Sequence, residues 1–170
     1  MDDTEVYIAV GSNEFPEKHI NMGLNLLQEN VLTDVRISSC YKSHSINGGE
    51  DYLNLVIRAE SMIDSYDELV LRLKEIEKKC GRVKNPYHSC VLDLDLLLFG
   101  KQVIKGKLPH EDLYKYLHVL VPFCELAGHE KDLLFNRTYS EILKSLEHSN
   151  DDIYLKRFDF IIEYLWVIIN

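Results

Sequence analysis

The stretch Val91-Leu92-Asp93-Leu94-Asp95-Leu96-Leu97-Leu98-Phe99 sets two carboxylates into an otherwise apolar run. A run of this length and character predicts a strand buried in a sheet, over Val91 to Phe99. Alternation places Asp93 and Asp95 on the same face of that strand, with about 7 Å between their Cα atoms. Two like charges this close repel each other and resist burial, so we expect a cationic group beside them.

The segments ahead of this strand predict the rest of the core. Strands are predicted over Val6–Val10, Val35–Tyr41 and Tyr52–Glu60, and helices over Pro16–Glu29 and from the capping box Ser65-Tyr66-Asp67-Glu68 to Cys80. With Val91–Phe99 added, the order is strand, helix, strand, strand, helix, strand. That order is typical of an α+β ferredoxin-like sandwich, in which an antiparallel sheet carries its helices on one face.

We expect a single domain that spans residues 1–170. Its core covers about residues 5–130, and about residues 131–170 form a C-terminal extension. Short helices are predicted over Glu111–Tyr116 and Ser140–Glu147. Ile153–Ile169 is strongly apolar, but its charged residues argue against a membrane span: Lys156, Arg157, Asp159 and Glu163. We predict an amphipathic helix that packs on the sheet or on a second subunit, in a monomer or a weak homodimer.

Net charge and cysteine usage restrict the partners and the compartment. A formal net charge of -9 disfavours a broad electrostatic grip on nucleic acid or on an anionic membrane. The four cysteines show no CxxC spacing, which argues against a zinc site, and no signal peptide is expected ahead of Val6. We therefore expect a cytoplasmic protein with reduced thiols.

A strand-borne D-x-D pair has two readings. It can hold Mg²⁺, which is commonly bound by one or two carboxylates together with substrate phosphates, or it can simply lie on a solvent-facing side of a strand. The basic and aromatic loop ahead of it, Gly81-Arg82-Val83-Lys84-Asn85-Pro86-Tyr87-His88, is a candidate phosphate clamp. Arg82 and Lys84 are equally explained by the dipole of the helix that ends at this loop.

A series of short motifs along the chain carries a resemblance. These are Gly11-Ser12-Asn13, Asp51-Tyr52-Leu53-Asn54, Glu77 ahead of Gly81-Arg82, Leu92-Asp93-Leu94-Asp95, Phe99-Gly100, Leu108-Pro109-His110 and Pro122-Phe123-Cys124-Glu125-Leu126-Ala127. In this order and spacing, over roughly residues 5 to 130, the chain resembles the 6-hydroxymethyl-7,8-dihydropterin pyrophosphokinase family of folate biosynthesis.

The resemblance implies an activity and a metal site. Members of the family transfer the β,γ-pyrophosphoryl group of ATP to the hydroxymethyl oxygen of the pterin and release AMP. The resemblance implies that Asp93 and Asp95 bridge two Mg²⁺ ions, that Asp93 also lies near the attacking hydroxyl of the pterin, and that Arg82 joins them as a catalytic residue. The charges of the two aspartates would then be offset by metal ions.

The resemblance also implies the substrate contacts. For the pterin these are Ser43, Tyr52 and Asn54, with His118 at the position of a second stacking aromatic and Asn13 ordering this side of the site. For ATP they are Glu77, Arg82, Lys84, His88, Lys107, His110 and Tyr116.

Three positions depart from the family pattern. Cys90 and Tyr116 stand where the family has arginines, and His118 stands where it has an aromatic residue. Each missing guanidinium removes a charge-assisted contact of about 1.5–3 kcal/mol, for which His88, Lys84 and Lys107 are the candidate replacements. Two other functions therefore stay open beside the enzyme: a catalytically weak paralogue that binds pterin or nucleotide, and a scaffold for a folate-pathway partner.

Overall fold

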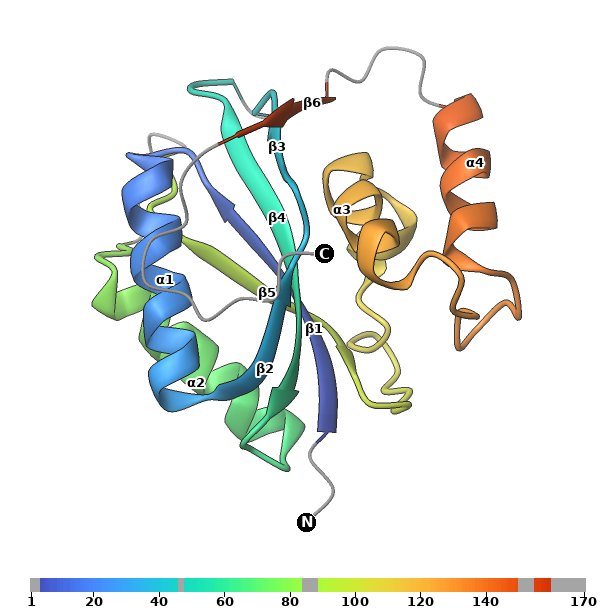
Figure 1. Cartoon of the computed structure of the whole chain (residues 1–170), viewed down its shortest axis with the longest axis horizontal. Helices are drawn as coiled ribbons and strands as arrows, with labels where there is room; N and C mark the ends of the chain where they lie inside the picture. The colour runs from blue at the N-terminus through green and yellow to red at the C-terminus, as the bar shows by residue number, and fades with distance from the viewer. Residues whose placement is uncertain (1–3, 46–47, 84–88, 150–154, 160–170) are drawn as a thin grey trace.

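The computed structural model describes residues 4–45, 48–83, 89–149 and 155–159 (Figure 1). Its elements are β1 (Thr4–Ser12), α1 (Pro16–Asn30), β2 (Leu32–Ile37), β3 (Cys40–Ser43), β4 (Tyr52–Ser61), α2 (Tyr66–Lys79), β5 (Asp93–Phe99), the 3-10 helix η1 (Glu111–Tyr114), α3 (Leu117–Ala127), α4 (Tyr139–Ser149) and β6 (Leu155–Phe158). If β2 and β3 are taken together as one broken strand, the first part of this order is the predicted strand and helix order. The α+β ferredoxin-like class is confirmed.

The sheet is antiparallel and runs in the order β5-β1-β4-β3-β6, with β2 also paired to β4. Its register decides where the functional residues meet. Gly11, near the end of β1, pairs with Asn54 of β4 on one side and with Asp93 of β5 on the other. Tyr52 pairs with Ser43 across β4 and β3. Residues from four strands therefore converge at one end of the sheet.

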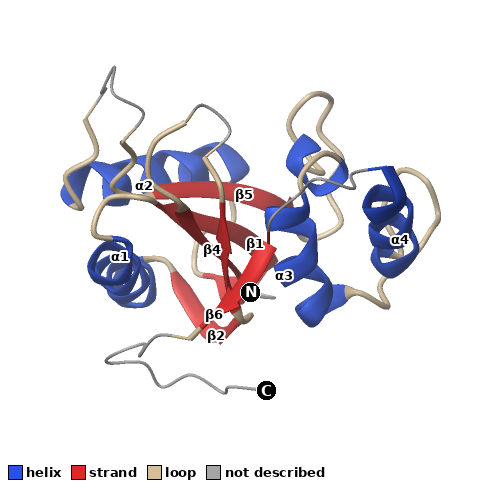
Figure 2. Cartoon of the chain, turned by 90° about the horizontal axis from the view of Figure 1, so that it is seen from above, coloured by secondary structure: helices blue, strands red, loops and turns tan. Residues whose placement is uncertain are grey.

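The two helices of the predicted core, α1 and α2, lie on one face of the sheet as expected, but α3 and α4 cover the other face, which was not predicted (Figure 2). Neighbouring residues of β4 point to opposite faces, yet Val56 and Ile57 are both fully buried, in two different apolar clusters. A strand buried on both sides needs a layer of helices on each.

Several predicted boundaries are also corrected. The strand predicted over Val35–Tyr41 is broken into β2 and β3 at Ser38, because the Ser38 hydroxyl accepts a hydrogen bond from the Val56 backbone N–H at 2.9 Å. The last strand of the core begins at Asp93 and not at Val91. Helix α3 had no predicted counterpart, whereas α4 confirms the predicted helix over Ser140–Glu147.

The predicted C-terminal helix is wrong where the structure describes it. Residues Leu155–Phe158 form β6, an edge strand that pairs with β3 (Figure 1). The remainder of the predicted helix lies outside the described residues. In the part of the chain that is described, no helix combines the length and apolar character needed to cross a membrane.

Candidate active site

A cavity of about 190 Å³ lies where β1, β4 and β5 come together beneath α3. Backbone alternation points Asp93, Asp95, Tyr52 and Asn54 toward it, and Gly11 lies between them without a side chain. The lining residues are Ala9, Val10, Gly11, Ser43, His44, Ser45, Tyr52, Asn54, Leu55, Asp93, Asp95, Asp112, His118 and Val119. The residues predicted to contact the pterin, Ser43, Tyr52, Asn54, His118 and Asp93, all line this one cavity.

The two strand aspartates lie on one face, as predicted, but their surroundings differ. Asp95 is half-buried, and its desolvation, together with the charge of Asp93, raises its pKa from the usual 3.8 to about 6. Asp93 is also half-buried and forms an ion pair with the guanidinium of Arg82. The cationic group expected beside the aspartates is thus present: it is the guanidinium of Arg82, which pairs with Asp93.

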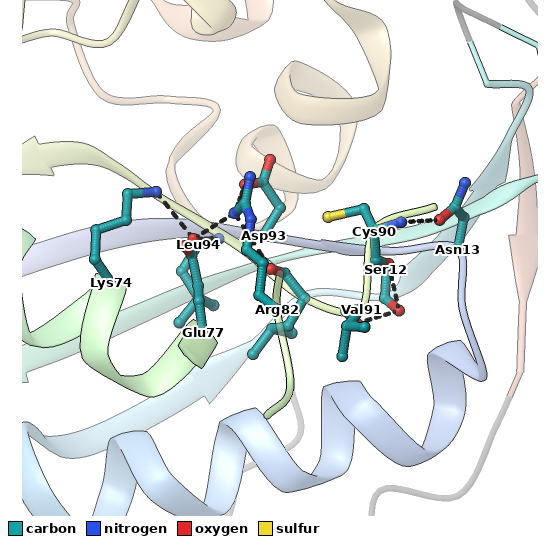
Figure 3. Close-up of polar contacts among 10 residues, drawn as sticks. Ser12, Asn13, Lys74, Glu77, Arg82, Cys90, Val91, Asp93 and Leu94 are labelled. Atoms are coloured by element: carbon teal, nitrogen blue, oxygen red, sulfur yellow. Dashed lines mark hydrogen bonds and ion pairs between the residues drawn. The ribbon is translucent and has the colours of Figure 1, made fainter. Parts of the chain in front are cut away.

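The position of Arg82 is set by a buried carboxylate (Figure 3). The side chain of Glu77 is 3% exposed, and its Oε1 accepts hydrogen bonds from the Leu94 backbone N–H at 2.8 Å and from Lys74 Nζ at 2.9 Å. The same oxygen forms an ion pair with Arg82 Nη1 at 2.8 Å. Glu77 therefore joins α2 to β5 and positions Arg82. Its direct contact with ATP stays a prediction, since its carboxylate is taken up by these donors.

The pterin side of the cavity has one aromatic ring on β4 and another on α3. Asn54 donates from Nδ2 to the Ser43 hydroxyl at 2.9 Å, which fixes the orientation of its amide. His118 stacks on Tyr116, with 5.2 Å between the ring centres, and burial lowers the pKa of His118. The imidazole is therefore held in the neutral form that favours packing against another ring.

Tight contacts at the end of β1 hold the segments that flank the cavity. The Asn13 side chain accepts from the Cys90 backbone N–H at 2.6 Å and donates to the Glu50 carbonyl oxygen at 3.3 Å. The Ser12 hydroxyl donates to the Val91 carbonyl oxygen at 2.6 Å (Figure 3). The segment before Tyr52 and the segment before Asp93 are thereby both tied to β1.

The residues predicted for ATP are less well assembled. Lys107 lies 3.4 Å from Asp67 and 5.1 Å from the ring centre of Tyr66, and His110 accepts from the Asp112 backbone N–H at 3.3 Å. Neither of them lines the cavity, and Tyr116 lies behind His118. Lys84 and His88 fall outside the described residues. These five assignments stay predictions.

Asp112 is a cavity residue that sequence reasoning missed. It follows the Pro109-His110 pair within η1, and it lies close enough to Asp95 to contribute to the raised pKa of that carboxyl. Three carboxylates thus face one cavity, although no group of three metal-binding side chains is arranged to hold an ion among the residues described. Asp93 and Asp95 would offer carboxylate oxygens to a metal ion. Two carboxylates suit Mg²⁺ when phosphate oxygens of a substrate supply further ligands.

Cys90 also lies close to this cluster, and its protonation state bears on the altered clamp. Burial raises the pKa of the Cys90 thiol to about 11, with a further contribution from the charge of Asp93. The thiol is therefore neutral at physiological pH and supplies no charge to a phosphate.

Comparison with known proteins identifies a single family. Residues 7–128 match the profile of 7,8-dihydro-6-hydroxymethylpterin-pyrophosphokinase (HPPK). The chain is 33% identical to the 2-amino-4-hydroxy-6-hydroxymethyldihydropteridine pyrophosphokinase of Haemophilus influenzae, over 72% of this chain and 81% of that protein. It is 30% identical to the protein of the same name from Aquifex aeolicus, over 85% of this chain and 91% of that protein.

In some longer proteins, the region similar to this chain is one part of the whole. A folate synthesis bifunctional protein of Arabidopsis thaliana is 34% identical over 74% of this chain, which spans 28% of that protein. A crystal structure of Plasmodium falciparum HPPK-DHPS superposes with a TM-score of 0.72 at 11% identity, covering 89% of this chain and 46% of that one. At this low identity the superposition supports the fold alone.

Proposed function

The chain belongs to the 7,8-dihydro-6-hydroxymethylpterin-pyrophosphokinase family, and on this premise we propose which of its residues carry the reaction. Enzymes of this family transfer pyrophosphate from ATP to 6-hydroxymethyl-7,8-dihydropterin in folate biosynthesis and release AMP. The observation that supports our assignment is the single cavity that brings Asp93, Asp95, Tyr52 and Asn54 together.

The pterin is proposed to lie in this cavity between Tyr52 and His118. Flat, fused rings stack well on aromatic faces, and a neutral imidazole serves as the second face. The Asn54 amide, oriented by Ser43, would pair with the polar edge of the ring. This orientation directs the hydroxymethyl group toward Asp93, which can accept a hydrogen bond from its hydroxyl.

Asp93 and Asp95 are proposed to hold Mg²⁺, which the family uses with ATP, and we propose two ions. Bound there with the triphosphate, Mg²⁺ would neutralise the charge that develops on the phosphates. A cation beside Asp95 would also lower the pKa of its carboxyl and keep it ionised.

The triphosphate is proposed to be held mainly by Arg82, with Lys84, His88, Lys107 and His110 around it. Glu77 would act by positioning Arg82. Because the Cys90 thiol is neutral, it does not replace the family's arginine. Tyr116 would act through His118, on which it stacks, more than through the nucleotide.

The protein's partners and compartment are proposals too. We propose a single cytoplasmic domain, monomeric or weakly dimeric. The scaffold alternative has support of its own, because relatives exist in which the matching region is one part of a bifunctional folate-synthesis protein. The binding-only alternative is favoured by Cys90 and Tyr116 at the positions of the family's arginines.

One assay separates these functions. The protein is incubated with Mg-ATP and 6-hydroxymethyl-7,8-dihydropterin, and AMP is quantified by chromatography, with calorimetry for pterin binding. The enzyme forms AMP only when both substrates are present. Pterin binding without AMP would establish the binding-only paralogue, and neither binding nor AMP would leave the scaffold.

A further inference from the structure

The guanidinium of Arg82 forms an ion pair with the carboxylate of Asp93. It contacts Asp93 Oδ1, lies 2.8 Å from Glu77 Oε1 and donates to the Leu92 carbonyl oxygen at 3.3 Å. The side chains of Arg82 and Asp93 are 35% and 37% exposed, whereas that of Glu77 is 3% exposed. Glu77 therefore fixes one end of this contact in the interior, whereas Arg82 and Asp93 are accessible to solvent and to a ligand.

A hydrogen bond holds the backbone of Arg82 in place, while its side chain can change conformation. The Arg82 N–H donates to the Glu77 carbonyl oxygen at 3.0 Å, just after Gly81 ends the α2 segment with a φ of 97°. Nη1 of Arg82 contacts both carboxylates and carries two N–H groups, and the guanidinium has five N–H donors in all, so it can leave Asp93 while it stays paired with Glu77. Glu77 can thus retain the side chain while Asp93 is released.

A hydrated Mg²⁺ ion and a triphosphate differ in how they meet this arrangement. The ion alone must displace a guanidinium from Asp93 and approach its positive charge. A triphosphate carries negative charge that attracts the same guanidinium into a bidentate contact, which frees the carboxylate as the phosphates arrive.

We propose that Arg82 is a built-in counter-ion that keeps metal off Asp93 until ATP draws its guanidinium onto the phosphates. This inference rests on the proposed function, because it concerns how the same site acquires its metal. Arg82 would then set the order of binding: metal and nucleotide bind together, and metal alone binds weakly.

The test uses Mn²⁺ alone as the probe, with no nucleotide and no pterin. Free Mn²⁺ is measured by electron paramagnetic resonance during titration of the whole chain. The unaltered protein should bind weakly, and Arg82→Gln should bind at least about tenfold more tightly, because a unit charge next to a divalent ion is removed. Arg82→Lys keeps the charge and should stay close to the unaltered protein.

Two further variants locate the effect. Arg72→Gln makes the same change of charge on the exposed side of α2, where Arg72 pairs with Glu75, and should leave Mn²⁺ affinity unchanged. Adding Asp93→Asn to Arg82→Gln should remove the gain, because the ion gained lies on Asp93. If Arg82→Gln does not fold, the double variant Arg82→Gln with Glu77→Gln removes both members of the ion pair and takes its place.

The proposal is overturned if the unaltered protein binds Mn²⁺ as tightly as Arg82→Gln, or if Arg82→Lys gains as much as Arg82→Gln. Failure of the proposed function would be recognised separately, as absence of AMP from Mg-ATP and the pterin. The Mn²⁺ titration contains neither substrate, so its result does not depend on turnover.

Discussion

Replacing Asp95 by asparagine should stabilise the metal-free protein while abolishing turnover. The carboxyl of Asp95 has its pKa raised from 3.8 to about 6 by burial and by the charge of Asp93. A raised pKa in the folded state means that folding favours the protonated form. The stability that this group contributes is complete below about pH 4 and is lost as the pH rises through 6.

The magnitude follows from the size of the shift. A rise of the pKa from 3.8 to about 6 corresponds to at most about 3 kcal/mol of unfolding free energy, lost by about pH 8. Screening by solvent should reduce this loss to about 2 kcal/mol. Asparagine resembles the protonated acid at every pH and avoids this loss. For a chain of this size, about 2 kcal/mol corresponds to a melting temperature about 4–8 °C higher at pH 8.

Thermal unfolding at several pH values checks this, with Asp34→Asn as the matched control. Asp34 is exposed on β2 and its φ of 47° suits asparagine, so removing its charge should have little effect. The advantage of Asp95→Asn should shrink toward zero near pH 4, and Mg-ATP should stabilise the unaltered protein and Asp34→Asn but not Asp95→Asn. A pH-independent advantage, or none at pH 8, would refute the reasoning.

Three further predictions concern the substrates. Tyr52→Ala should weaken pterin binding by about 1–3 kcal/mol in calorimetry and leave ATP binding unchanged, whereas an equal loss for both ligands would make Tyr52 a structural residue. Asn13→Asp keeps the acceptor for Cys90 and loses the donor to Glu50, so KM for the pterin should rise about fivefold with little change in kcat; a selective loss for ATP would contradict this. Cys90→Arg should tighten Mg-ATP binding at least about tenfold, because the neutral thiol supplies no charge, and an unchanged affinity would show that position 90 does not face the phosphates.

Local sequence patterns were sufficient for the core of the fold. Alternation in Asp93–Phe99, the capping box at Ser65 and the turn after β1 each depend on near neighbours. The order of these elements then limits the topology, and the sheet places Asp93 and Asn54 on either side of Gly11. The grouping of Tyr52 and Asn54 with the two aspartates at one site was predicted from the family resemblance, and the sheet order agrees with it.

The errors arise where long-range contacts decide the structure. The break at Ser38 depends on a hydrogen bond from Val56, and β6 is a strand because it pairs with the edge of β3. Helix α3 contains Pro122, which weakens a helical signal, yet the helix is held by packing of its apolar side on the sheet. Asp112 reaches the cavity through the path of η1, which no periodicity reveals.

The central claim, that Asp93 and Asp95 support pyrophosphoryl transfer to the pterin, is tested most directly by phosphorus NMR of the products. The unaltered protein with Mg-ATP and 6-hydroxymethyl-7,8-dihydropterin should yield AMP and a pterin diphosphate in equal amounts. Asp93→Asn and Asp95→Asn, each shown to be folded, should yield neither at a measurable rate. Formation of ADP in place of AMP, or near-normal AMP from either variant, would contradict the account.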